Sequence, residues 1–168
     1  PGRAGSESDV RDSLLRIMES KTKRILVTSF ASNVARMESI FYCAKKTGRA
    51  ICLVGRSMHR IFKAAKKCGY LKGLIDPIEP RNAKKVAKNK ILYLATGSQG
   101  EPMGAMNRII NGSHPEVLLE EGDCVIFSSK IIPGNEKKLY NLQNQIVRNN
   151  IEIISEENAF VHVSGHPN

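Results

Sequence analysis

Short apolar runs alternate along the chain with stretches in which apolar residues recur every three or four positions. Continuous apolar runs of this length are typical of strands that are buried on both faces. They lie at residues 24–29, 50–54, 90–95, 123–127, 151–154 and 159–163. The strand pattern is therefore spread over the whole chain.

The stretches between these runs predict amphipathic helices. Ser6 or Ser8 can cap the first helix, and Ser32 or Asn33 can cap the second, which Gly48 closes. Three further helices are predicted around residues 58–65, 103–110 and 135–149, and residues 71–90 form a longer connection. Uniformly apolar strands separated by such helices predict an α/β fold with three αβα layers and a doubly wound, mainly parallel sheet.

Hydroxyl, amide and glycine residues follow the predicted strands, at the edge where open parallel sheets bind ligands. They are Ser29 to Asn33, Gly55 to Ser57, Thr96 to Glu101, Ser128 to Lys130 and Ser164 to His166. Serine and asparagine also cap helices, and for Ser57 and Ser128 we favour capping. The edge as a whole predicts a binding site.

Residues 96–101 form the most distinctive of these loops, because Gly97 and Gly100 would let the backbone approach a ligand. Pro102 suits the first position of a helix, whose N-terminus would attract an anion. We expect Glu101 to orient the loop or a hydroxyl. The pattern predicts a phosphate site, although it is neither a Walker A loop nor a dinucleotide fingerprint.

His162 and His166 lie four positions apart near the end of the chain. This spacing suits a metal only on a helix, which Gly165 and the preceding predicted strand disfavour. His166 is a natural general acid for a leaving oxygen. His162 is either a structural histidine or a ligand-binding one, and no metal site is predicted in this chain.

The composition adds a charge argument. Lys and Arg number 26 against 16 Asp and Glu, a formal net charge of +10 with a pI near 9.6. Such an excess favours polyanionic partners. Aromatic residues make up 5% and tryptophan is absent, which argues against a base-stacking platform.

Four cysteines, at positions 43, 52, 68 and 124, lie far apart among apolar residues. We expect buried free thiols in a reducing cytoplasm. No apolar run approaches the ~20 residues that a membrane span needs. A cytoplasmic protein without membrane contact is therefore expected.

Six motifs occur in an order that resembles the bacterial ribonuclease J family. They are Phe30-Ala31-Ser32-Asn33, Gly55-Arg56-Ser57-Met58, Thr96-Gly97-Ser98-Gln99-Gly100-Glu101-Pro102-Met103, Phe127-Ser128-Ser129, Ile132-Pro133-Gly134-Asn135 and His162-Val163-Ser164-Gly165-His166. Together they cover nearly all 168 residues and resemble the β-CASP domain that this family inserts into a metallo-β-lactamase fold.

The resemblance implies a zinc-dependent RNA hydrolase with 5′-to-3′ exonuclease and endonuclease modes, acting in RNA processing. His166 would lie beside the scissile phosphate, and His162, Ser164 and Gly165 would hold a 5′-phosphate. The RNA path would be lined by Ser32, Asn33, Ser98, Gln99, Gly100 and Glu101. Two zinc ions, RNA as partner and a homo-oligomer are expected for the full-length enzyme.

The lactamase motifs of that family are absent from this sequence, which starts at Pro1 rather than at methionine. We therefore expect residues 1–168 to be a single β-CASP domain, an excised fragment that needs the missing lactamase domain and is inactive alone. Two alternatives stay open: a phosphosugar- or nucleotide-binding doubly wound domain, and a dimerising scaffold without a pocket.

Overall fold

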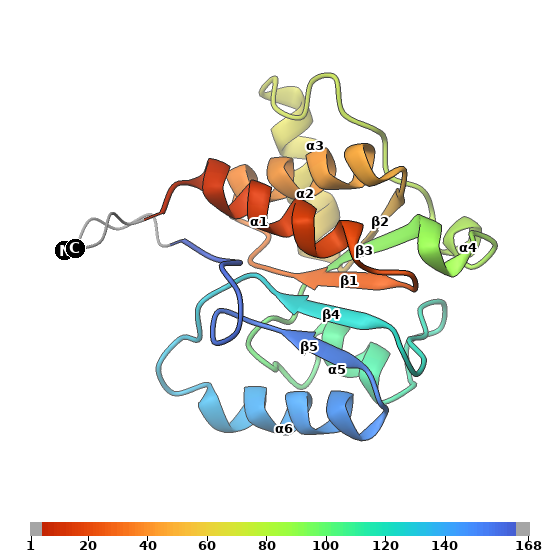
Figure 1. The fold of residues 1–168 in the computed structure, drawn as a ribbon, viewed down its shortest axis with the longest axis vertical. Helices are drawn as coiled ribbons and strands as arrows, with labels where there is room; N and C mark the ends of the chain where they lie inside the picture. The colour runs from red at the N-terminus through yellow and green to blue at the C-terminus, as the bar shows by residue number, and fades with distance from the viewer. Residues whose placement is uncertain (1–4, 164–168) are drawn as a thin grey trace.

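A five-stranded parallel sheet forms the centre of the molecule in a computed structural model that describes residues 5–163 (Figure 1). Its strand order is β2-β3-β1-β4-β5. The strands are β1 (Ile25–Thr28), β2 (Ala50–Val54), β3 (Ile91–Ala95), β4 (Cys124–Phe127) and β5 (Glu152–Ile154). All four neighbouring pairs are parallel, so every strand presents its carboxyl end at the same edge.

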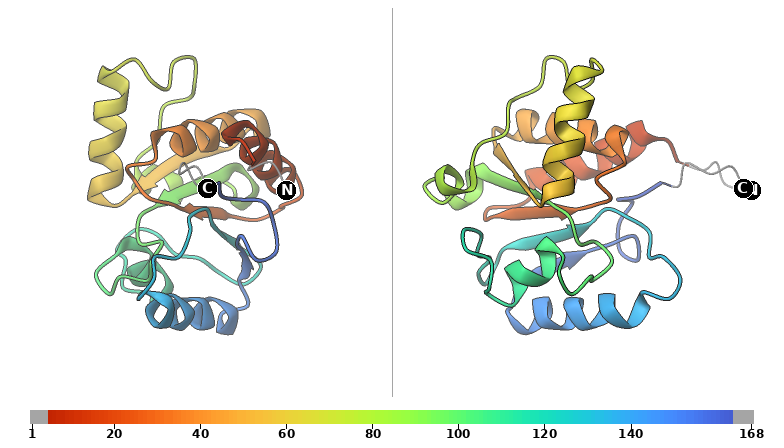
Figure 2. Two further views of the ribbon diagram at one scale, coloured as in Figure 1. Left: turned by 90° about the vertical axis from the view of Figure 1, so that its left-hand side faces the viewer. Right: turned by 180° about the vertical axis from the view of Figure 1, so that it is seen from behind.

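Helices cover both faces of this sheet (Figures 1 and 2). One face carries α1 (Glu7–Glu19), α2 (Val34–Thr47) and α3 (Arg56–Lys67), and the other carries α5 (Ala105–Ile110) and α6 (Glu136–Arg148). The short helix α4 (Pro80–Ala83) and the 3₁₀ turn η1 (Lys88–Lys90) lie in the predicted long connection. The predicted three-layer α/β fold is confirmed.

Alternating side chains along each strand build two separate apolar cores. Val27 points into the core beneath α1, α2 and α3, whereas its neighbour Leu26 points into the core beneath α5 and α6. Successive side chains of a strand face opposite sides of the sheet. Strands between two helix layers therefore need apolar residues at every position, which explains the continuous runs in the sequence.

The predicted helix ends agree with the cap geometry. Ser6 caps α1 in a capping box with Asp9, and Asn33 caps α2 by accepting a hydrogen bond from the Arg36 backbone N–H at 3.0 Å. Gly48 closes α2 with φ +69°, a conformation that favours glycine. Local sequence chemistry is therefore sufficient to place these three boundaries.

Residues 159–163, predicted to be a strand, form no regular element. Val161 is fully buried in the core beneath α1 and α2, but Phe160 is 42% exposed. Gly5 packs against the Phe160 ring, so the two ends of the described chain lie together. An apolar run becomes a strand only where a sheet edge accepts its backbone, and here side chains bind the backbone instead.

The cysteine prediction is correct for three of the four residues. All four thiols are free, and Cys43, Cys52 and Cys124 are buried, but Cys68 is exposed beyond the end of α3. Burial raises the pKa of each buried thiol to about 12. The buried thiols are therefore protonated and unreactive at neutral pH.

Across residues 5–163, the helices are too short or too polar to span a membrane.

Candidate functional site

The loops that follow β1, β2, β3 and β4 meet at the carboxyl edge of the sheet, as the sequence predicted. The loop after β1 leads to α2 on one face, whereas the loops after β3 and β4 lead to α5 and α6 on the other. Ser164, Gly165 and His166, the predicted fifth contribution, lie outside the described residues. The edge is the position where parallel α/β sheets bind ligands.

Arg36, on α2, is the central buried group at this edge. Its side chain is fully buried, and its Nε and Nη2 donate to the two Glu7 carboxylate oxygens at 2.9 and 3.1 Å. Nη1 donates to the Ser128 carbonyl at 2.9 Å, to Ser128 Oγ at 2.7 Å and to the Val161 carbonyl at 3.1 Å. One guanidinium therefore joins α1, α2, the end of β4 and the C-terminal segment.

This network also reaches His162. Arg36 Nη1 lies 3.4 Å from His162 Nδ1, and because arginine has only donors, Nδ1 must be the acceptor. Burial lowers the pKa of His162, and the positive charge of Arg36 lowers it further. A neutral imidazole is thus fixed at the carboxyl edge.

Ser128 and Ser57 do not cap helices, contrary to our expectation. Ser128 Oγ donates to the Val161 carbonyl and accepts from Arg36. Ser57 lies inside α3, whose N-cap is Gly55 without a side-chain cap. Helix α3 begins at Arg56, one residue before Ser57, and α6 has Asn135 as its N-cap, well after Ser128.

Gln99 holds the 96–101 loop against the loop after β4. It is 3% exposed, and its side-chain amide donates to the Lys130 carbonyl at 3.0 Å and accepts from the Ile132 N–H at 2.8 Å. Ser98 is also buried, and its Oγ accepts from Gln99 Nε2 at 3.4 Å. The side chains of Ser98 and Gln99 therefore shape the edge from inside.

The two glycines of this loop allow the backbone to pack closely on α5 and α6, and they do not form an open site for a phosphate. A Cβ on Gly100 would lie 2.7 Å from the Lys138 carbonyl of α6, and one on Gly97 would lie 3.0 Å from the Met106 nitrogen of α5. The Gly100 N–H donates to Gly97, and the Gln99 N–H donates to the Glu101 carboxylate at 3.3 Å. Glu101 thus orients the loop, as expected.

Pro102 is not the first residue of a helix, contrary to the sequence prediction. Helix α5 begins at Ala105 with Gly104 as its N-cap, and Pro102 belongs to the preceding turn. The Gly104 N–H donates to the Glu101 carbonyl at 2.9 Å, which closes that turn before the helix. The turn therefore separates the 96–101 loop from the helix start that was predicted to attract an anion.

Two further predicted site residues lie on the loop after β1. Ser32 is exposed, whereas Asn33 is partly buried because its side-chain oxygen caps α2. The sequence predicted that Ser32 or Asn33 would cap a helix at this edge. It did not predict the Arg36 network beside them. A lone arginine on a helix resembles a solvated residue in sequence.

A small cavity of about 30 Å³ lies behind the loop after β4. Ser98, Ser129, Ser155, Gln143 and Glu156 are among the residues that line it. The buried Ser129 Oγ has no hydrogen-bond partner among the described residues. Phe127, Ile131 and Leu139 also line it, and the volume and the Ser129 hydroxyl suit one ordered water molecule.

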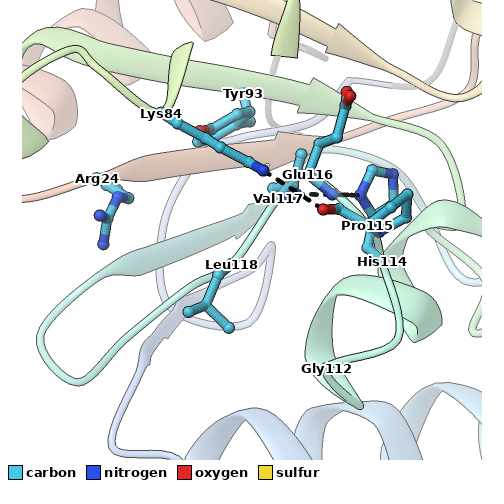
Figure 3. Close-up of a pocket in the computed structure, with 9 residues that line it drawn as sticks. All are labelled: Arg24, Lys84, Tyr93, Gly112, His114, Pro115, Glu116, Val117 and Leu118. Atoms are coloured by element: carbon cyan, nitrogen blue, oxygen red, sulfur yellow. Dashed lines mark hydrogen bonds between the residues drawn. The ribbon is translucent and has the colours of Figure 1, made fainter. Parts of the chain in front are cut away.

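A larger hollow, of about 430 Å³, lies away from these loops (Figure 3). Its lining includes Arg24, directly before β1, which marks the opposite edge of the sheet. His114 lines this hollow, and its Nδ1 accepts from the Glu116 and Val117 N–H groups at 3.2 and 3.1 Å. Burial and Arg108 lower the His114 pKa. This histidine holds a turn, and the hollow is separate from the carboxyl edge.

A family model described as "Ribonuclease J, beta-CASP domain" matches residues 22–146. The chain belongs to this family. The β-CASP chain is 37% identical to Ribonuclease J of Corynebacterium glutamicum, 41% to Ribonuclease J 1 of Streptococcus pyogenes and 34% to Ribonuclease J of Thermus thermophilus. Each match covers 99% of this β-CASP chain but only 23%, 30% and 29% of the relative. The chain thus spans less than a third of the length of these relatives.

Within residues 5–163, no group of three or more His, Cys, Asp or Glu side chains gathers where it could hold a metal ion. The resemblance implies two zinc ions for the full-length enzyme and none on this chain. The donors that this chain does bring to the carboxyl edge are hydroxyl, amide and imidazole groups, which bind anions and nucleotides by hydrogen bonding.

Proposed function

We propose that this chain is the RNA-binding β-CASP domain of a ribonuclease J-type hydrolase that cleaves RNA phosphodiester bonds in RNA processing and decay. The observation that carries the proposal is that relatives named Ribonuclease J match 99% of the chain. A net charge of +10 supports a polyanionic substrate. The complete enzyme acts as a 5′-to-3′ exonuclease and as an endonuclease.

In this proposal the exposed Ser32, the Asn33 amide and Glu101 line the RNA path. Ser98, Gln99 and Gly100 form its wall, since their contacts tie the 96–101 loop to the loop after β4 and to α6. His162, Ser164 and Gly165 bind the 5′-phosphate. The Arg36 network supports the proposed role of His162 in phosphate binding, because it fixes a neutral imidazole at the same edge.

His166 is proposed to protonate the leaving oxygen. The role comes from the resemblance and from the chemistry of imidazole, since this residue lies outside the described part of the chain. Two zinc ions belong to the proposal only as a property of the complete enzyme, and no step is assigned to a metal held by this chain. We expect this chain alone to be inactive, and RNA hydrolysis by it with added Zn²⁺ would contradict that expectation.

RNA affinity of the Asn33→Asp variant tests the proposed path. Aspartate caps a helix as well as asparagine does, so the fold should be unchanged, but a carboxylate replaces an amide donor beside the phosphates. We expect weaker binding of a 5′-phosphorylated single-stranded RNA, measured by fluorescence anisotropy. The loss should shrink as salt screens the repulsion.

Asn89→Asp, an equal change of charge at an exposed position on the opposite edge of the sheet, serves as the control. An equal loss in both variants would mean that only net charge matters. The phosphosugar alternative predicts instead that the chain binds a sugar phosphate at all salt concentrations and does not bind RNA. That result would overturn the proposed function.

A further inference from the structure

Helix α3 carries a row of exposed basic side chains that extends beyond the carboxyl edge, where only its first member, Arg56, lies. Its 12 residues contain five Lys or Arg and no acidic residue, which is half of the chain's net charge of +10. Six of its residues line one shallow open hollow of about 560 Å³. One is Ala64, and the other five are Arg56, His59, Arg60, Lys63 and Lys67, here called the α3 stripe.

The α3 stripe opposes the stability of its own helix. Arg56 and Arg60, like Lys63 and Lys67, are four residues apart, a spacing at which like charges repel. Arg56 also lies in the first helical turn, where the helix dipole disfavours a cation. Among the described residues, the ion pair of α3 is Lys66–Asp76, outside the stripe. The helix dipole favours Lys67, which lies in the last turn, but folding gives no reason for the two pairs of like charges, whereas an anionic partner does.

The stripe begins next to the candidate RNA path. Gly55, at the carboxyl end of β2, directly precedes Arg56, and a Cβ on Gly55 would lie 2.3 Å from Thr96 Oγ1. Thr96 is the first residue of the 96–101 loop, and its N–H donates to the Val54 carbonyl at 3.2 Å. The first basic side chain is thus adjacent to the loop, and Figure 2 shows α3 running away from the sheet from that point.

We propose that the α3 stripe is a second binding segment for the phosphate backbone of single-stranded RNA, continuous with the carboxyl edge. This inference rests on the proposed function. Arg56 and Lys67 are 11 residues apart, about 16 Å along a helix, enough for several consecutive phosphates. Because ammonium and guanidinium groups bind phosphates whatever the base, the segment binds RNA independently of sequence.

The opposite face of α3 excludes a membrane as the partner. Met58 and Ala65 are 1% and 4% exposed and belong to the core beneath α2. An interfacial helix needs a free apolar face to enter the lipid, and α3 has already buried its own. An acidic protein is the competing partner for the α3 stripe. Binding of poly-glutamate, measured beside binding of RNA, distinguishes the two partners.

The test compares the wild-type chain with an Arg60→Gln/Lys63→Gln double variant, since glutamine keeps the helix propensity and removes both charges. RNA binding is measured against salt concentration with oligonucleotides of about 4 and about 16 nucleotides, the range that single-strand sites cover. For the long RNA we expect the slope of log K against log salt to fall in magnitude by about 1.4, since each phosphate contact contributes about 0.7. Binding of the short RNA should be unchanged, because the carboxyl edge alone accommodates it.

Lys85→Gln/Lys90→Gln is the matched control, with the same loss of charge at exposed positions near the start of β3. An equal change of slope in both double variants, or none in the α3 variant, would overturn the inference and leave the proposed function intact. Loss of poly-glutamate binding with RNA binding unchanged would identify an acidic protein as the occupant and would also overturn it. If the wild-type chain bound neither RNA, the proposed function itself would fail.

Discussion

Arg36 shows what a single residue can decide in this fold. Its buried guanidinium reaches Ser128, 92 residues away, and Val161, 125 residues away, while also pairing with Glu7. A buried ion pair is not by itself a large gain in stability, but removing Arg36 leaves the Glu7 carboxylate without its cationic partner and the Ser128 carbonyl without its arginine donor. The residue therefore determines where the C-terminal segment lies.

Arg36→Met, which keeps the length of the side chain and removes every donor, should lower the free energy of unfolding by about 3–5 kcal/mol. Urea denaturation measures this. Arg16→Met, at an exposed position on α1, should change stability by no more than about 0.5 kcal/mol. A loss below about 1 kcal/mol for Arg36→Met would show that the network is not needed for stability.

At the scale of elements, the 96–101 loop is held by close backbone packing on α5 and α6. Gly100 has φ +76°, and a Cβ at this position would lie only 2.7 Å from the Lys138 carbonyl, so a side chain there strains the loop and displaces α6. The path proposed for RNA runs beside this contact. The shape of this path depends on Gly100, because only a residue without a Cβ lets the loop pack this closely on α6.

Gly100→Ala should therefore destabilise the protein by clearly more than about 1 kcal/mol, which is the scale of backbone strain alone. Gly112→Ala is the control, because Gly112 has a similar φ of +80° with open space around it. The difference between the two variants in thermal or urea denaturation isolates the steric term. Equal losses would mean that α6 shifts freely and that the loop does not depend on it.

For the whole molecule, two histidines make stability depend on pH. The pKa values of His114 and His162 are lowered in the folded state, so the unfolded chain binds protons more tightly. Their contribution to stability is fully present above the ordinary histidine pKa, about 6.5, and is lost as pH falls toward the folded values. Carboxylates titrate mainly below this range and contribute little above pH 5.5, roughly.

We expect the free energy of unfolding to fall steadily between about pH 7 and pH 5.5. A His114→Asn/His162→Asn variant should show a flatter profile, since asparagine keeps an acceptor oxygen but does not titrate. His59→Asn, at an exposed position on α3, should follow the wild type. A wild-type profile that is flat or rises toward pH 5.5 would refute the assignment.

The sequence alone determined the features that depend on neighbouring residues. Apolar runs marked the five strands of the sheet, cap residues such as Ser6 and Gly48 marked helix ends, and the ordered motifs indicated the family. Each of these signals is local, because side-chain alternation and capping involve residues a few positions apart. The carboxyl edge could be predicted because parallel strands share one direction.

Only the tertiary structure decided which polar residues are internal supports. Gln99 lies buried between two loops, residues 159–163 form no strand, and Arg36 connects elements far apart in sequence. The proposed role of the basic residues of α3 also depends on the tertiary structure, which places the start of this helix beside Thr96. These features depend on long-range contacts, and the free energy of a buried polar group is set by the partners that the fold brings to it.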